Sequence, residues 1–127
     1  MPYRFSKHYS LEEAREFLPI VQNWIDELIA LREELGKVDQ ALESRLRTGV
    51  DLGGATVNER TRSVARFQSI LGEFQSAEIQ LKDLDRGLVD FPHLRAGEEV
   101  FLCWESGEDD IDFWHELDTG FAGREPI

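Results

Sequence analysis

The sequence has very little cysteine and no long hydrophobic run. Its 127 residues include one cysteine, Cys103, which excludes an internal disulfide and a four-cysteine zinc site. No apolar run approaches the roughly 20 residues that a membrane-spanning helix needs. Residues 1–10 also lack the apolar core of a signal peptide. We therefore expect no membrane association and a cytoplasmic location.

Basic residues are scarce as well. The chain has 14 Lys and Arg against 26 Asp and Glu, a formal net charge of −12. Duplex nucleic acid and anionic membranes both attract positive surfaces, so this balance argues against either as a partner. The length fits one domain over residues 1–127. Both the hydrophobic pattern and the charge density change near residue 79, which predicts two subregions, 1–78 and 79–127.

The first subregion has the apolar spacing of a long helix. Ser10 and Glu13 form a capping-box pattern, which predicts a helix start there. The helix should end near Thr48, and Pro19 should kink it or mark a later start. Its apolar residues recur at spacings of three and four, typical of a heptad seam. They are Leu11, Ala14, Leu18, Val21, Ile25, Leu28, Leu35, Val38 and Leu42.

A glycine-rich turn over residues 48–55 separates this helix from a second one, predicted over residues 56–77. We predict that the second helix faces the first with Val57, Val64, Phe67, Leu71 and Phe74. A short turn makes the two helices antiparallel neighbours. Because the first helix is longer, its first turns extend past the second and need another partner.

The second subregion has the pattern of short strands and turns. Residues 79–85 alternate apolar and polar, residues 88–91 form a second run that Pro92 ends, and residues 100–104 are the most strand-like. A turn is predicted at residues 96–97. The fold class we predict is α+β: a long antiparallel two-helix hairpin packed on a small antiparallel β unit.

Several motifs in this subregion resemble a known family. They are Ile79-Gln-Leu-Lys-Asp-Leu-Asp-Arg-Gly-Leu-Val-Asp-Phe-Pro92, Leu102-Cys-Trp104, Gly107-Glu108, Phe113-Trp-His115 and Gly120-Phe-Ala-Gly-Arg124. With Tyr9-Ser-Leu-Glu-Glu-Ala and Leu18-Pro19 near the start, the chain resembles the bacterial and archaeal domain-of-unknown-function family 2203 over nearly its whole length. The resemblance supplies a family but no activity that could be carried over to this chain.

Four residues are candidates for a divalent metal ion. Asp83 and Asp85 would share one side of a strand, because residues two apart point the same way. Asp90 on the next strand and His115 as a ligand or base would complete the site. The alternative is that Asp85 begins a turn while Asp83 faces water, since Asp is common in turns.

Cys103 has two interpretations. It lies between Leu102 and Trp104, so we favour a buried cysteine that acts as a small hydrophobe. The other interpretation makes it a metal ligand or a nucleophile, near His93 or paired with His115. The acidic surroundings oppose the lowered thiol pKa that a nucleophile needs. We expect Arg124 to bind one carboxylate of the acidic run. That run consists of Glu105, Glu108, Asp109, Asp110, Asp112, Glu116 and Asp118.

Arginines gather where the two predicted helices meet. They could contact an anion or a partner, although solvated arginines are the plain alternative. They are Arg45, Arg47, Arg60, Arg62 and Arg66. The first functional hypothesis is a non-catalytic interaction or scaffold protein that forms a homo-oligomer, or binds a protein partner, through its helices. The second is a divalent-metal-binding module or metal-dependent enzyme. Nucleic-acid contact through the arginines ranks third.

Overall fold

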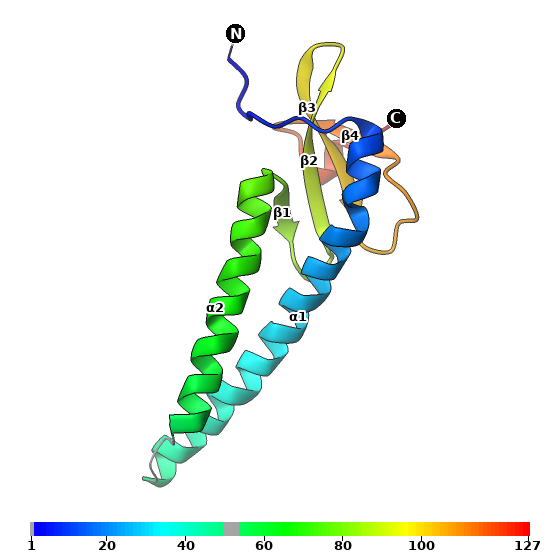
Figure 1. The fold of residues 1–127 in the computed structure, drawn as a ribbon. Helices are drawn as coiled ribbons and strands as arrows, with labels where there is room; N and C mark the ends of the chain where they lie inside the picture. Colours follow the sequence, from blue (N-terminus) through cyan, green and yellow to red (C-terminus); the bar gives the residue numbers. More distant parts are fainter. Residues whose placement is uncertain (1, 50–53) are drawn as a thin grey trace.

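The protein is an α+β fold in which a helical hairpin projects from one end of a β sheet (Figure 1). The computed structural model describes residues 2–49 and 54–127. Two helices pack against each other and against a five-stranded antiparallel sheet, as the sequence predicts. Neither described helix contains an apolar stretch long enough to cross a membrane.

Helix α1 spans Leu11–Thr48 and begins and ends where the sequence indicates. The capping box is formed: Glu13 N–H donates to the Ser10 hydroxyl at 3.1 Å, and Ser10 N–H donates to Glu13 Oε1 at 3.0 Å. Pro19 lies inside the helix and does not delay its start. The predicted seam is buried at Ala14, Val21, Ile25, Leu28 and Val38, which makes it the inner face of the helix.

Helix α2 spans Gly54–Ala77 and runs back along α1 (Figure 1). Of the predicted turn, residues 50–53 lie outside the described residues. The predicted inner face of α2 is wrong in part, because Val57 and Leu71 are each 40% exposed. The helix is rotated so that Ser63 and Ile70 are buried instead, beside Phe74. Val57, Val64 and Leu71 lie along one edge of the true face, so the apolar period alone could not place the centre of that face.

The sheet is a simple meander. Its strand order is β1-β2-β3-β4-β5, with each strand antiparallel to the next. A short 3₁₀ helix, η1, covers Phe121–Gly123 before the last strand. The strands are β1 (Gln80–Asp83), β2 (Leu88–Arg95), β3 (Glu98–Glu105), β4 (Phe113–Glu116) and β5 (Glu125–Pro126).

Strand β2 continues through Pro92, where the sequence predicted that it would stop. Pro92 stays in register with Phe101 of β3. Its carbonyl accepts from Tyr9 N–H at 2.7 Å, so this residue's backbone groups point away from β3. On that side β1 does not extend as far as Pro92, because its first residue, Gln80, pairs with Asp90. The proline therefore breaks no bond between strands, which is why the strand tolerates it.

The helices cover one face of the sheet. The first turns of α1, which the sequence predicted to extend past α2, pack on this face. Ala14 and Val21 lie in the same buried cluster as the strand residues. Alternation along the strands sends every second side chain to this face. The strand residues of this core are Val89, Phe91, Leu102 and Trp104.

The opposite face is partly covered by the N-terminal strap, residues 3–9. Phe5 packs on Phe101 with ring centroids 5.4 Å apart. Glu99 accepts the backbone N–H groups of Arg4 at 2.8 Å and Phe5 at 3.0 Å. Its other contact is His8 Nε2 at 2.7 Å. Burial by itself would raise the pKa of Glu99, but these bonds outweigh burial and lower it.

We expect Glu99→Gln to loosen the strap, because the charged acceptor of these hydrogen bonds is lost. The free energy of unfolding should fall by about 1–2 kcal/mol at pH 7. Since the folded pKa of Glu99 is lowered, its contribution exists above the unfolded value of about 4.3 and is lost as the pH falls through the folded value. The difference in unfolding free energy between the wild type and this variant, measured with urea, should therefore be smaller at pH 3 than at pH 7. The exposed neighbour Glu98, changed to Gln, is the control; an equal loss at both pH values would contradict this account.

Candidate functional site

Three strands bring one carboxylate, one thiol and one imidazole to the same place on the face opposite the helices. Asp90 of β2 lies directly across from Cys103 of β3. His115 of β4 pairs with Phe101, two residues before Cys103 on β3. Directly paired residues share a face, and diagonal neighbours remain within reach of long side chains. The sheet register therefore makes these three side chains converge.

The three groups are close and fully enclosed. One ligand atom from each of Asp90, Cys103 and His115 lies within 4.8 Å of the other two. Their exposed fractions are 2%, 0% and 1%. Within residues 2–49 and 54–127 no other group of three or more His, Cys, Asp and Glu side chains has this arrangement. Charged groups are rarely buried so completely unless they are paired or bind a metal ion.

Hydrogen bonds fix the orientation of the His115 ring. Nδ1 lies 2.7 Å from the carbonyl oxygen of Glu116. A carbonyl oxygen can only accept, so Nδ1 carries a proton and donates it. Nε2 on the opposite edge of the ring lies 3.0 Å from Asp90 Oδ1. This is the arrangement typical of a metal-binding histidine, whose other ring N–H donates to a carbonyl group.

The environment shifts the pKa of His115 upward. Burial alone would lower it, because burial disfavours the imidazolium ion. The hydrogen bonds to Asp90 and to the Glu116 carbonyl, together with the negative charge of Asp90, outweigh burial and raise the pKa. Asp90 therefore stabilises the protonated form of the ring relative to a free imidazole.

The thiol of Cys103 is in a different state. Burial, reinforced by the charge of Asp90, raises the pKa of Cys103 to about 12, although Arg124 acts in the opposite direction. At neutral pH the thiol keeps its proton. It is a poor nucleophile, because the thiolate is the reactive species. Both nitrogens of His115 are already bonded, so the structure gives no support to a Cys103–His115 catalytic pair.

Of the four predicted metal ligands, the structure brings Asp90 and His115 together and leaves the other two outside. Strand β1 ends at Asp83, so Asp85 does not share a strand face with it. Asp83 Oδ1 accepts from Arg86 N–H at 3.2 Å and begins the turn. Asp85 forms an exposed ion pair with Arg32 at 2.7 Å. The expectation of four converging ligands is therefore wrong for Asp83 and Asp85.

The predicted basic cluster is largely neutralised within the hairpin. Arg66 binds Glu27 through two nitrogens at 2.6 and 2.9 Å. Arg60 pairs with Asp39 at 2.7 Å, and Arg47 lies 3.8 Å from Glu43. The remaining members of the cluster are Arg45 and Arg62. Because carboxylates already occupy these three arginines, the case for an anion site is weaker than the sequence suggested.

Arg124 binds the acidic run as predicted. Its partner is Glu108, reached by two nitrogens at 2.9 and 3.1 Å. Such bidentate pairs are directional as well as strong. Its Nη1 also points toward Cys103 Sγ at 3.9 Å. Arg124 therefore links the acidic loop to the buried cluster.

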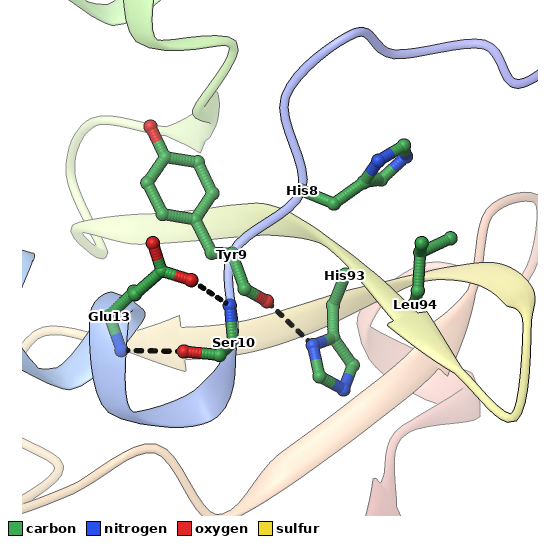
Figure 2. Close-up of a pocket in the computed structure, with 6 residues that line it drawn as sticks. All are labelled: His8, Tyr9, Ser10, Glu13, His93 and Leu94. Carbon is green, nitrogen blue, oxygen red and sulfur yellow. Dashed lines mark hydrogen bonds between the residues drawn. The ribbon is translucent and has the colours of Figure 1, made fainter.

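A separate pocket of about 290 Å³ lies where the strap meets the start of α1 (Figure 2). Its polar groups are already used within the chain. His93 Nδ1 donates to the Tyr9 carbonyl at 2.6 Å, and Ser10 and Glu13 form the capping box. Figure 2 shows both sets of bonds around the opening. These residues anchor the strap to the helix start. The lining consists of His8, Tyr9, Ser10, Glu13, His93 and Leu94.

Sequence reasoning weighed Cys103 as a metal ligand but favoured a buried hydrophobe and left it out of the four-residue site, although a signal existed. Ala96 and Gly97 both have positive φ, as a two-residue hairpin turn requires. The pair flanking the turn is Arg95 and Glu98. Counting back from this pair along both strands places Asp90 opposite Cys103. Ending the strand at Pro92 prevented that count.

Comparisons with known proteins give a family and no activity. The family model described as "Uncharacterized conserved protein (DUF2203)" matches residues 7–127. No curated protein and no solved structure matches the chain.

We expect Asp90→Ala to destabilise the protein by about 3–5 kcal/mol, because it leaves the buried His115 without its partner. Asp85→Ala removes only an exposed ion pair and should cost at most about 1 kcal/mol. Urea unfolding of metal-free protein at pH 7 measures both. If both variants lose the same free energy of unfolding, the buried pair contributes no more to stability than the exposed one.

Proposed function

The chain belongs to the DUF2203 family, and we propose that it is a metal-binding module that holds one divalent ion of the zinc type. The ligands in this proposal are Asp90 Oδ, Cys103 Sγ and His115 Nε2. The observation that carries it is the convergence of these three buried atoms within 4.8 Å of one another. Ligands bound to one zinc ion at about 2.0–2.3 Å lie at comparable separations from one another.

The donor set favours zinc over magnesium or calcium. Magnesium and calcium take oxygen ligands almost exclusively. A thiolate and an imidazole beside one carboxylate suit zinc and the neighbouring transition metals. The proposal therefore keeps Asp90 and His115 from the sequence-based site and replaces Asp83 and Asp85 with the thiolate of Cys103.

Binding would exchange protons for the ion. To hold the ion, Cys103 Sγ and His115 Nε2 would each release a proton to solvent. Asp90 would then serve as a ligand in place of a hydrogen-bond acceptor. His115 Nδ1 keeps its bond to the Glu116 carbonyl, which holds the ring in place. Three protein ligands leave one position of a tetrahedral ion for a further ligand.

Metal-free protein, prepared by chelation, should gain stability when zinc is added. At 100 times the dissociation constant the gain is about 2.7 kcal/mol. For a domain of this size, Tm should rise by roughly 5–15 °C. Magnesium at the same excess should leave Tm unchanged. The cobalt-substituted protein should show a thiolate-to-metal charge-transfer band, which reports the Cys103–metal bond directly.

Matched variants separate the site from its surroundings. Cys103→Ala should abolish the cobalt band and most of the zinc-dependent rise in Tm. Asp85→Asn should keep both, because Asp85 lies outside the cluster. If the wild-type protein shows neither a zinc-dependent Tm shift nor a cobalt band, the Asp90–His115 pair is purely structural and the proposal fails.

A second candidate function is self-association through the helices. The observation that favours it is an uncharged row on the outer side of α2, which includes the 40%-exposed Val57 and Leu71. A charge-free face is where two copies of a chain with net charge −12 meet least repulsion. The row is Val57, Thr61, Val64, Gln68 and Leu71.

Light scattering should then show a dimer that Leu71→Glu converts to a monomer, because the new charge lies within the paired row. Leu46→Glu adds the same charge at an exposed leucine of α1 outside this row and should leave the dimer intact. A wild-type protein that stays monomeric at high concentration would refute the association.

A further inference from the structure

Arg124 lies over the sulfur of the buried cluster. Its guanidinium group is 3.9 Å from the centre of the Phe113 ring and 4.4 Å from that of Phe121. Phe113 is the register partner of Cys103, so the stacked arginine is held above that strand position. Its Nη1 reaches Cys103 Sγ at 3.9 Å. Although the group is charged, the side chain is only 13% exposed.

Glu108 holds Arg124 in this position. Two nitrogens of the guanidinium bind its two carboxylate oxygens at 2.9 and 3.1 Å. Glu108 Oε1 also accepts the backbone N–H of Glu105, at the end of β3, at 2.7 Å. The anchor of Arg124 is therefore itself bonded to the strand that carries Cys103.

The segment that carries Arg124 is otherwise attached by few interactions. It consists of the three-residue helix η1 and the two-residue strand β5. Strand β5 pairs only with β4, through Phe113 and Trp114. Ile127 N–H adds one bond to the Asp112 carbonyl at 2.9 Å, and Arg86 stacks on the Phe121 ring at 4.2 Å. Short edge elements of this kind open locally at a small fraction of the global unfolding free energy.

The other cover of this face is held differently. The strap residue Phe5 packs on Phe101, whose ring centre is 5.5 Å from that of His115. Glu99 and Glu78 together accept the backbone N–H groups of residues 4–7. The strap therefore meets the site through Phe101, whereas the C-terminal segment reaches the sulfur directly. Opening of the C-terminal segment would expose the sulfur of Cys103 directly, whereas opening of the strap would expose Phe101 first.

We propose that Arg124 is the latch of the metal site: the ion enters and leaves beneath its side chain when the segment Phe121–Ile127 lifts. This inference rests on the proposed metal-binding function. The Arg124–Glu108 pair sets how often the segment lifts, so it controls the rate of metal exchange. Arg124 is a positioning residue, because it contacts the ligand Cys103 and not the ion.

The test is the rate at which zinc-loaded protein loses its ion to excess chelator, followed by the absorbance of a chromogenic chelator well below Tm. Arg124→Gln should release zinc about tenfold faster or more, because a bidentate charge-assisted pair is lost. Glu108→Gln should act in the same direction and serves as the second variant if Arg124→Gln fails to fold. Hydrogen exchange of residues 121–127 should accelerate in parallel.

Arg60→Gln is the matched control. Arg60 pairs with Asp39 at 2.7 Å between the two helices, so its loss removes an arginine–carboxylate pair that does not touch the segment. Its zinc release should stay within about twofold of the wild type. If Arg124→Gln and Glu108→Gln release zinc at the wild-type rate, the latch is overturned while metal binding stands. If the wild-type protein takes up no zinc, the proposed function itself fails.

Discussion

Both faces of a five-stranded sheet must be covered, and the chain provides helices for only one of them. The arrangement of the remaining parts of the chain follows from this constraint. The two ends of the chain cover the second face, Phe5 from the N-terminal strap and Arg124 from the C-terminal segment. The buried polar cluster lies between these two covers. A face that is covered by short terminal segments can open locally, whereas the helix-covered face cannot open without loss of the main core.

The excess of acidic residues also has a structural explanation. Several carboxylates serve as hydrogen-bond acceptors that tie distant parts of the chain together. Glu78 and Glu99 accept backbone N–H groups of the strap, and Glu108 accepts both Arg124 and a backbone N–H of β3. Hydrogen bonds to charged acceptors are stronger than those between neutral groups. The carboxylates that give the chain its negative charge therefore contribute to the fold itself.

The buried cluster differs from these surface interactions in its chemistry. Asp90 and His115 alone would form a buried salt bridge. Such a bridge adds little to the free energy of unfolding, but removing one partner lowers that free energy strongly. The thiol of Cys103 carries no charge at neutral pH, yet it lies within 4.8 Å of both partners. A mixed oxygen, nitrogen and sulfur donor set is the feature that a zinc-type ion would use. The latch that we assign to Arg124 contacts this same sulfur.

The sequence by itself determined what depends on local signals. The capping box at Ser10, the heptad seam to Leu42, the alternating strands and the Ala96–Gly97 turn all act over a few residues, so the α+β architecture could be predicted. Tertiary structure decided which face of α2 is buried, since apolar residues continue along one edge of that face. It also decided that β2 passes Pro92, because that depends on where β1 begins. The convergence of His115 with Asp90 and Cys103 depends on the β3–β4 register, which the loop between these strands does not encode in any local pattern. Asp83 and Asp85 looked like ligands in the sequence but lie outside the cluster, because the strand ends between them.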